Sequence, residues 1–312
     1  MADITLLEAA KHSKSALEAF VTKIIVEASP ILEYLPMKTI TGPALRYHRE
    51  MSLGTISFRG VGGSYTADTG VINPLFEALV IMGGEVQVDN FDIATMQNLL
   101  DLKASKYKMK ARAAGILFTE TFFEGDTAVD PYSFDGLRKR LPIGGTQALL
   151  QDADGGDLEI VRLDELLDMV VGNNTDKVLF MSPSMRRHLT FKVRTHTGTG
   201  LITFTQDNFG KQQMKYADAT IRLMVREDDG STILDYDEYP GAGASDTASI
   251  YCVRFGTEFI HGIQNSSLPS VKDFGEQEAK PAHLGRIEWY CGMVMKHPRC
   301  AARLYGITDA DA

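Results

Sequence analysis

Two acidic runs are the first candidates for chemistry, because alternating carboxylates can bind a divalent cation. Asp152-Ala-Asp154-Gly-Gly-Asp157-Leu-Glu159 resembles a fragment of a calcium-binding loop, but its glycine is misplaced and the distant bidentate glutamate is missing. Asp235-Tyr-Asp237-Glu238 is a weaker candidate of the same kind. An acidic surface turn accounts for both runs better than an ion does, so we predict no metal and no cofactor.

Cys291, His297 and Cys300 are residue types that zinc prefers, yet their spacing fits no common zinc pattern. Cys291 also lies on the apolar side of an alternating segment, which favours packing in the core over metal binding. With Cys252 the chain has three cysteines, an odd number without paired spacing. We therefore predict reduced, mostly buried thiols and no disulfide framework.

The segment Arg59-Gly60-Val61-Gly62-Gly63 is superficially similar to the loops that hold phosphate groups. It lacks the spacing of a nucleotide-binding fingerprint, and no helix start follows it. Glycine is common in turns because it adopts backbone conformations that other residues avoid. A flexible hairpin is therefore the better interpretation.

His188 and His196 lie in a basic segment of the chain and could suggest a catalytic pair. We interpret this segment as a charged rim that faces an acidic partner rather than as a catalytic pair. Its basic residues are Arg186, Arg187, Lys192 and Arg194. The sequence has no Gly-x-Ser-x-Gly motif, no two-histidine zinc helix and no nucleophile beside an evident base. We predict no active site and no enzymatic activity.

The composition is that of a folded protein rather than a disordered or membrane-spanning one. The 312 residues are 44% hydrophobic and 23% charged, and no apolar run approaches the roughly 20 residues that cross a bilayer. The first residues lack the pattern of a secretory signal, so we expect the protein to be made and folded in a cytoplasm. A net charge of -9 argues against tight binding of nucleic acid, although it is compatible with enclosing it.

Two segments of the first half have the apolar spacing of helices. Residues 4–28 predict an amphipathic helix that ends before Pro30, packed either on its own domain or on a neighbour. Residues 95–124 predict one long helix, about 45 Å at ~1.5 Å per residue, that ends at Gly125. Its apolar face is Met96, Leu100, Tyr107, Ala111, Ala114, Phe118 and Phe122. Its basic residues are Lys103, Lys106, Lys108, Lys110 and Arg112, interpreted as a solvated face, with an inward-facing DNA contact as the weaker alternative.

Between these helices, residues 38–78 predict a long hairpin. Its first arm is extended from Leu45 to Phe58, and a glycine-dense reversal follows. Such a ribbon is too polar to have a core of its own, and an isolated two-stranded ribbon is marginally stable, so it needs a partner surface. A strand from Phe76 to Asp89 comes next, with a bulge predicted at its Gly83-Gly84 pair.

The second half combines helices and strands. We predict a helix over about 158–171, a buried strand at 177–181, and then a helix that Ser182 caps, with Pro183 at its first position. Strand-rich segments follow at 219–240 and 247–263, and one alternating strand closes the chain over 286–307. This succession predicts an α/β or α+β domain.

The order of these parts resembles the major capsid proteins of tailed bacteriophages with the Hong Kong 97-like fold. The ribbon from Leu45-Arg-Tyr-His-Arg-Glu through Phe58-Arg-Gly, then Ser64-Tyr-Thr to Gly70-Val-Ile-Asn-Pro, is similar to that family's extended loop. Residues 95–124 are similar to its spine helix. Residues 286–307, beginning Arg286-Ile-Glu-Trp, are similar to its closing segment, which returns to the peripheral domain and ends in a Pro-x-x-Ala-like turn and strand.

The resemblance implies an α+β fold with four regions. These are an N-terminal arm at 1–44, an extended loop hairpin at 45–78, a peripheral domain with the long spine helix at 79–143 and 264–312, and an axial α/β domain at 144–263. The axial domain would crowd the symmetry axes of hexamers and pentamers. The implied subunit contacts are Arg46, Arg49, Phe58, Arg59, Tyr65, Arg186 and Arg187.

Two departures from the family pattern affect how subunits would hold together. Some members join subunits covalently through a lysine of the extended loop, but here no lysine occurs between Lys38 and Lys103. Cohesion is therefore expected to be noncovalent, with Arg46, Arg49 and Arg59 in the loop instead. Some members also carry a long charged N-terminal scaffolding segment, whereas this chain starts directly on the arm, which implies a separate scaffolding protein or prior processing.

The function implied by the resemblance is that of a major capsid protein, which self-assembles into an icosahedral phage head of hexamers and pentamers enclosing double-stranded DNA. Expected partners are further copies of the chain, a scaffolding protein and a portal, with no membrane and no sequence-specific DNA binding. The location would be the virion, after assembly in the host bacterial cytoplasm. Two alternatives stay open: an encapsulin-type shell that encloses a cargo enzyme, and a soluble metal-dependent enzyme that uses the acids near 152–159 or 235–238.

Overall fold

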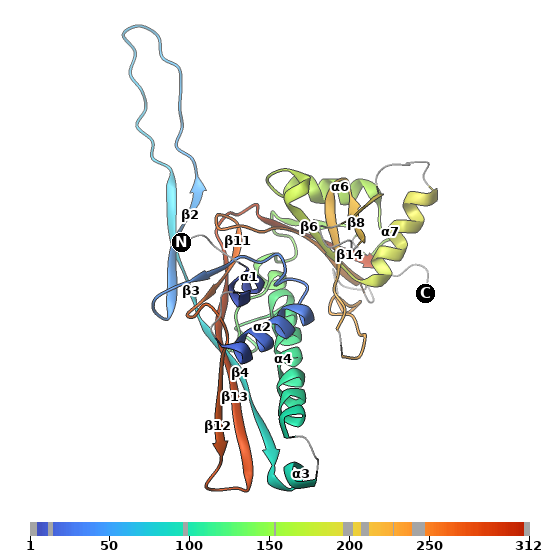
Figure 1. Ribbon diagram of the computed structural model, residues 1–312. Coiled ribbons are helices and arrows are strands. Elements are labelled where there is room, and N and C mark those ends of the chain that lie inside the picture. The colour runs from blue at the N-terminus through green and yellow to red at the C-terminus, as the bar shows by residue number, and fades with distance from the viewer. Residues whose placement is uncertain are drawn as a thin grey trace.

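The protein, seen in a computed structural model, consists of two sheets, a long helix and a projecting hairpin (Figure 1). The hairpin extends beyond the five-stranded sheet at one end, and the helix runs alongside that sheet toward the other end (Figure 1). The seven-stranded sheet lies to the side, near the C-terminal end of the helix (Figure 1). The structure describes residues 5–11, 15–95, 99–152, 154–195, 202–206, 212–226, 228–238 and 247–308.

The N-terminal segment contains two helices in its described part, α1 (Leu6–Lys11) and α2 (Ala16–Ala28). The Ser15 side chain accepts a hydrogen bond from the backbone N–H of Glu18, as a capping residue does at a helix start. The helix end predicted before Pro30 is confirmed. The apolar face of α2 packs against the long helix and so joins the main core.

The extended loop is a hairpin of β2 (Ala44–Ser52) and β3 (Val71–Ala78), paired antiparallel from Ala44 opposite Ala78 to Ser52 opposite Val71. The prediction of an extended arm to Phe58 is too long for the paired part, because residues 53–70 form no strand. Those residues have no second layer to cover them. The paired part of the hairpin, in contrast, reaches the five-stranded sheet through buried apolar side chains at its base.

The five-stranded sheet is built around one long strand near the C-terminal end of the chain. The backbone ladder between β4 and β13 runs without interruption past Gly83 and Gly84, so the bulge predicted there is wrong. Gly83 allows close approach instead, since a Cβ there would lie 2.5 Å from the carbonyl oxygen of Ile287. The strands are β1 (Met37–Thr39), β4 (Val80–Asp89), β11 (Ile260–Gln264), β12 (Ser270–Glu276) and β13 (Ala282–Met295).

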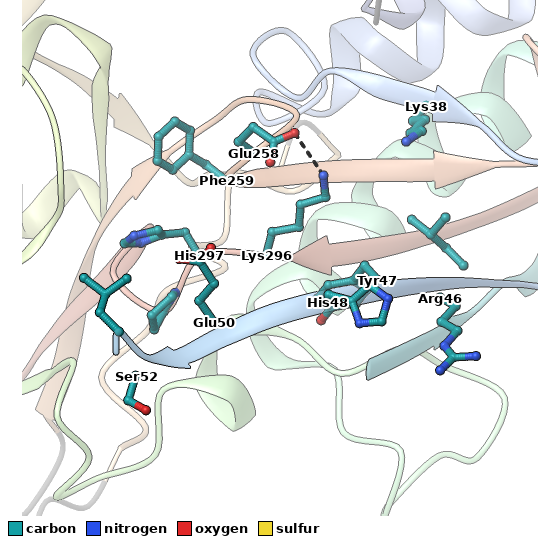
Figure 2. Close-up of a pocket in the computed structure, with 13 residues that line it drawn as sticks. Lys38, Arg46, Tyr47, His48, Glu50, Ser52, Glu258, Phe259, Lys296 and His297 are labelled. Atoms are coloured by element: carbon teal, nitrogen blue, oxygen red, sulfur yellow. Dashed lines mark hydrogen bonds and ion pairs between the residues drawn. The ribbon is translucent and has the colours of Figure 1, made fainter. Parts of the chain in front are cut away.

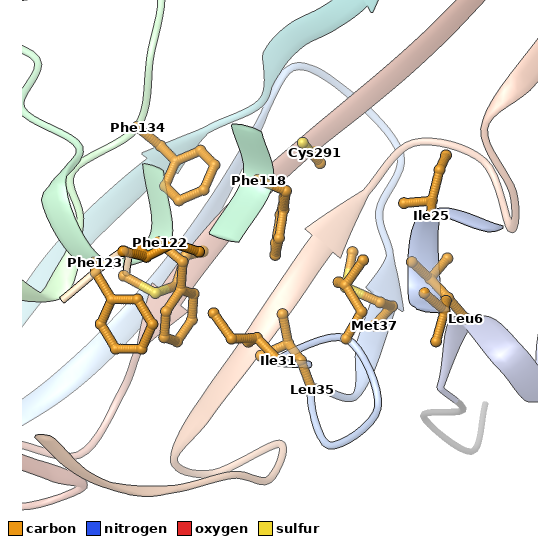
Figure 3. Packing of buried hydrophobic residues seen from close by; sticks show 14 of the residues in the cluster. Leu6, Ile25, Ile31, Leu35, Met37, Phe118, Phe122, Phe123, Phe134 and Cys291 are labelled. Carbon is orange, nitrogen blue, oxygen red and sulfur yellow. The ribbon is translucent and has the colours of Figure 1, made fainter. Parts of the chain in front are cut away.

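The long predicted helix is confirmed as α4 (Leu99–Glu124), preceded by α3 (Asn90–Thr95) and followed by α5 (Leu137–Arg140). Its face at Tyr107, Ala111, Phe118 and Phe122 is buried. Figure 3 shows three phenylalanines of α4 beside residues of the N-terminal segment and Cys291 of β13, in one continuous core. Met96 and the side chain of Leu100 lie outside the described residues.

The seven-stranded sheet contains the remaining strands. Their order is β5 (Ala148–Leu150), β14 (Ala301–Thr308), β10 (Thr247–Arg254), β6 (Lys177–Met181), β9 (Ala219–Leu223), β8 (Gln212–Tyr216) and β7 (Ile202–Gln206). The helices of this part are α6 (Ile160–Met169) and α7 (Pro183–Thr195), with the short 3-10 turn η1 (Asn174–Asp176) between them. The predicted cap of α7 is confirmed, because the Ser182 hydroxyl accepts from the backbone N–H of Met185 at 3.2 Å.

The single closing strand predicted over 286–307 is wrong, because the segment forms two strands in two different sheets. β13 belongs to the five-stranded sheet and β14 to the seven-stranded sheet, and a turn containing Pro298 separates them. Proline cannot donate to a ladder, which helps to end β13 there. The alternation predicted at Ile287, Trp289 and Cys291 is confirmed by their burial.

The two sheets are joined by aromatic packing at the end of α4. The Phe123 ring lies 5.5 Å from that of Phe180 in β6 and 5.3 Å from that of Tyr251 in β10. These contacts use one face of the seven-stranded sheet, while α6 and α7 pack on its other face in a separate apolar cluster. In the described part of the chain, no helix combines the length and apolar character that a membrane span requires.

Candidate assembly surface

The tip of the hairpin exposes large apolar side chains that have no contact with the core. Leu53 is 84% exposed, and Ile56, Phe58 and Val61 are essentially fully exposed. Soluble monomers rarely display such side chains in one contiguous segment, and segments that do are usually binding surfaces. The segment lies in the part of the loop that projects farthest from the molecule (Figure 1). The tip therefore has the character of a surface that a partner covers.

The tip is shaped by its own hydrogen bonds even though it is exposed. The Asp68 carboxylate accepts from the hydroxyl of Thr55 at 2.7 Å and from its backbone N–H at 3.1 Å, and these bonds lower the pKa of Asp68. Near the reversal, the backbone N–H of Gly63 donates to the carbonyl of Gly60 at 3.1 Å. The Arg59 guanidinium donates to the carbonyl of Gly63 at 3.1 Å. The loop thus has a defined path before any partner arrives.

The base of the hairpin is fixed to the body by an ion pair. The Arg140 guanidinium donates to both carboxylate oxygens of Glu77, at 2.6 and 2.9 Å, and to the carbonyl of Met293 at 3.3 Å. The Tyr47 hydroxyl donates to Glu77 at 3.4 Å and to the carbonyl of Met295 at 3.3 Å. Burial raises the pKa of Tyr47 to about 12, so this hydroxyl stays a donor. This anchor connects β2, β3, α5 and β13.

A surface groove of about 620 Å³ lies beside the hairpin base. Figure 2 shows side chains of β2 on one side, and Glu258, Phe259, Lys296 and His297 on the other. The Lys296 ammonium donates to the Glu258 carboxylate at 3.0 Å across the groove wall. The lining of the groove mixes charged and apolar groups, a composition that suits contact with a polypeptide.

The contact residues predicted in the loop lie on the hairpin, and three of them interact within it. Arg46 lies 5.5 Å from the ring centre of Phe76, and Arg59 lies 5.1 Å from that of Tyr65. Phe58 is fully exposed. Arg49 is half-buried, and its Nε atom has no hydrogen-bond partner in the described residues. The structure does not bring Arg186 and Arg187 to the hairpin, since both are exposed on α7.

A cluster of acids and arginines, buried only at Glu238 and Arg303, lies where α4 and α5 meet the seven-stranded sheet. Glu238 pairs with Arg303 at 2.5 Å and with Arg138 at 3.7 Å, and Asp237 pairs with Arg138 at 3.6 Å. Burial, together with the nearby Asp237 charge, raises the pKa of Glu124 to about 7. Two acids of the 235–238 run, Asp237 and Glu238, therefore pair with arginines, and Asp235 accepts a hydrogen bond from the backbone N–H of Tyr236.

The other candidates for chemistry are in similar structural surroundings. Asp157 of the calcium-like run pairs with Lys192 of α7. Burial raises the pKa of Cys291 far above its ordinary value and that of Cys300 to about 12, as expected for thiols packed in the core. Among the described residues no three His, Cys, Asp or Glu side chains are grouped closely enough to hold an ion. His196 lies outside the described residues.

The basic residues of α4 divide into two groups. Lys103 pairs with Asp273 of β12 at 3.3 Å, so it helps to hold the helix on the sheet. Lys106, Lys108 and Lys110 are exposed, as expected for a solvated face.

Sequence reasoning missed the features that fix the hairpin and join the two sheets. Glu77 and Arg140 are 63 residues apart, and Glu238 and Arg303 are 65 apart, so no local pattern connects them. The one usable signal was Glu77, the single charge in the apolar run from Leu75 to Met82, since a charge at a half-buried position usually has a partner.

No protein-family model and no curated protein matches this sequence. Solved structures do match. The SrpI encapsulin complex of Synechococcus elongatus matches with a TM-score of 0.67 at 12% identity, over 91% of this chain and 90% of that one. A structure from Microbacterium phage Oxtober96 matches with a TM-score of 0.62 at 11% identity, over 89% and 90%. The capsid of a native GTA particle matches with a TM-score of 0.61 at 10% identity, over 91% and 90%. The chain therefore has the α+β Hong Kong 97-like fold that these capsid and encapsulin proteins share.

Proposed function

We propose that this protein is the shell-forming subunit of a phage head, with a structural rather than a catalytic role. Copies of the chain would associate into hexamers and pentamers of a closed icosahedral shell that encloses double-stranded DNA. A scaffolding protein and a portal would take part in assembly in the bacterial cytoplasm, and the virion would be the final location. The shared fold of capsid and encapsulin proteins supports this proposal.

The observation that carries the proposal is the hairpin, which is firmly anchored at its base and uncovered at its tip. Leu53, Ile56, Phe58 and Val61 expose apolar surface that a monomer would not keep in water without a use. Burying these four side chains against a neighbour contributes on the order of 6 kcal/mol per subunit, before the cost of ordering the loop. Each subunit of a closed shell makes such a contact, so modest contacts sum to a stable particle.

The grip of the loop is proposed to be noncovalent. No lysine lies between Lys38 and Lys103, so the loop offers no amine for an isopeptide bond. Arg46 and Arg59 stack on aromatic rings of the hairpin and keep their guanidinium groups at the surface. There they would orient the loop against acidic groups of a neighbour more than add affinity.

The direct test is deletion of residues 52–68. In the deleted chain, the paired residues Glu50 and Ile72 would be connected by Met51, Thr69, Gly70 and Val71. Four residues are an ordinary length for a hairpin connection. The deleted subunit is expected to fold, with the circular dichroism and thermal transition of the parent, and to form no shells in negative-stain microscopy. Shells of normal size from the deleted chain would overturn the proposed role of the loop.

A matched variant keeps the loop length and removes only its apolar side chains. Replacing Leu53, Ile56, Phe58 and Val61 by serine leaves the anchor at Glu77 and Arg140 in place. Loss of shells in this variant assigns the contact to apolar burial. Shells that form as in the parent would show that length and backbone pairing suffice.

The contents of the shells distinguish a phage head from an encapsulin-type compartment, which the match to the SrpI encapsulin complex keeps as the second candidate. Particles purified from the native source should contain nuclease-protected double-stranded DNA if the proposal holds. Particles filled with a single protein and free of DNA would support the encapsulin-type function instead.

A further inference from the structure

Helix α7 is a strongly basic element on an acidic protein. Its sequence, Pro-Ser-Met-Arg-Arg-His-Leu-Thr-Phe-Lys-Val-Arg-Thr, contains no acidic residue, although acids outnumber bases over the whole chain by 41 to 32. Met185, His188 and Leu189 face the core, which leaves Arg186, Arg187, Phe191 and Arg194 exposed. No ion pair of these three arginines occurs within the described residues.

The outward face of α7 also contains an apolar group. Phe191 is 57% exposed and follows Arg187 by one helical turn, and Arg194 follows Phe191 by nearly another. The three side chains therefore form one stripe along the helix. An aromatic ring between two arginines is a composition enriched in protein interfaces.

Helix α6 is the acidic counterpart on the same sheet. Leu163, Leu166 and Leu167 face the core, and the opposite positions are exposed. Residues 159–169 contain four acids and one base. The exposed residues Val161, Glu165 and Asp168 have the same spacing as the stripe on α7, and Val161 is 65% exposed. The base of this segment, Arg162, pairs with Glu165 at 2.8 Å.

The two helices lie side by side on one face of the seven-stranded sheet. Their buried residues belong to the same apolar cluster, and Lys192 of α7 pairs with Asp157 just before α6. Figure 1 shows α7 at the outer edge of this part of the molecule, with α6 next to it. One layer of each subunit thus has an acidic helix beside a basic helix.

We propose that α7 of one subunit docks against α6 of the next copy of the chain. The inference rests on the proposed shell function and names a contact within it. A contact between two different patches of the same chain is head-to-tail and generates closed rings when the rotation closes. Repetition around the ring gives every basic helix an acidic partner, so all copies are neutralised equally.

Two observations favour a second copy over nucleic acid as the occupant of α7. The exposed Phe191 ring lies in the middle of the basic stripe, where a phosphate backbone would gain nothing from it. The matching acidic stripe of α6 is present on every subunit in equal number. Charge pairs of this kind steer association and fix its register.

The test uses charge reversal in two separate chains. The first carries Arg187→Glu and Arg194→Glu, and the second carries Glu165→Lys and Asp168→Lys. These side chains are exposed, and the one ion pair lost among the residues that the structure describes is the surface pair of Arg162 with Glu165. Each reversed chain should keep the thermal transition of the parent. Each alone should need at least a tenfold higher concentration than the parent to form shells or rings, measured by light scattering and microscopy.

Mixing the two reversed chains is the decisive arm. Strict alternation then places a reversed α7 against a reversed α6, and an ordinary α7 against an ordinary α6. Every contact is restored in a ring with an even number of subunits, so the mixture should assemble near the parent concentration into even-membered rings. A contact within one chain could not be repaired in this way.

The other outcomes are equally informative. If either reversed chain assembles like the parent, or if the mixture stays unassembled, the α6–α7 contact is overturned and the shell function stands. If reversal of α7 leaves assembly unchanged and lowers the nucleic acid retained in the particles, the helix contacts nucleic acid instead. If the unaltered chain forms no closed particle at all, the proposed function fails, and this contact fails with it.

Discussion

Replacing Glu77 by glutamine tests whether the ion pair of Glu77 with Arg140 fixes the hairpin in its orientation on the body of the protein. The substitution keeps the shape of the side chain and removes its charge, which leaves the Arg140 guanidinium without a counterion. The side chains of Arg140 and Glu77 are only 14% and 21% exposed, and two hydrogen bonds join them at 2.6 and 2.9 Å. This pair is far more enclosed than the surface pairs of the protein.

The expected cost follows from that enclosure. Removing one partner of a fully buried ion pair destabilises a protein by about 3–5 kcal/mol, and exposed pairs contribute about 0–1 kcal/mol. Glutamine retains one oxygen that can accept from Arg140, and the site is partly wet. We therefore expect Glu77→Gln to lower the free energy of unfolding by about 2 kcal/mol.

The assay combines urea denaturation with hydrogen exchange. The control is Glu85→Gln on the neighbouring strand β4, where Glu85 pairs with Arg286 at 2.7 Å and both side chains are well exposed. We expect a loss below about 1 kcal/mol for this control. Amides of 45–50 should exchange faster in Glu77→Gln and not in the control. Equal effects of the two substitutions, or unchanged exchange in the hairpin, would refute the reasoning.

Two further substitutions test the core of the five-stranded sheet. His261 is fully buried, neither ring nitrogen has a hydrogen-bond partner in the described residues, and burial lowers its pKa to about 4. The histidine of the unfolded chain binds a proton more readily than the buried His261 does. The free energy of unfolding should therefore fall as the pH drops from about 6.5 toward 4, and at pH 5 it should be about 2 kcal/mol lower than at neutral pH. The variant His261→Leu should lose that dependence in urea titrations at pH 7.5 and 5, and an unchanged acid sensitivity would contradict the account. Gly285→Ala should cost about 2 kcal/mol, since its Cβ would lie 1.8 Å from the buried Tyr107 hydroxyl, whereas Gly60→Ala, with open space around it, should be near neutral in thermal melts.

The sequence predicted those parts of the fold that depend on neighbours along the chain. The spacing of Tyr107, Ala111, Phe118 and Phe122 identified the long helix and its buried face. Ser182 marked the start of α7, because capping is a contact between residues three apart. The hairpin was also visible from its glycine-dense reversal between two extended arms.

The errors arise where distant segments decide the structure. Gly83-Gly84 was interpreted as a bulge, whereas the ladder is regular there and Gly83 provides room for the backbone of β13, about 200 residues later in the chain. Residues 286–307 are divided between two sheets because β13 pairs with β4, β11 and β12, whereas β14 pairs with β5 and β10. Of these partners, β4, β5 and β10 lie far away in the sequence. The ion pair of Glu77 and Arg140 was missed for the same reason, because its two residues are distant in the sequence. Pairing over long sequence distances leaves no periodic pattern to detect.

The position of the last two strands constrains when the chain can fold during its synthesis. β13 pairs with β4, β11 and β12, and β14 lies between β5 and β10, so each sheet is missing an interior strand until residues 282–308 have left the ribosome. Local elements such as α4 can form earlier, but neither sheet can close around a gap. Shortened or unfinished chains would therefore lack both the support for the hairpin and a complete sheet beneath α6 and α7.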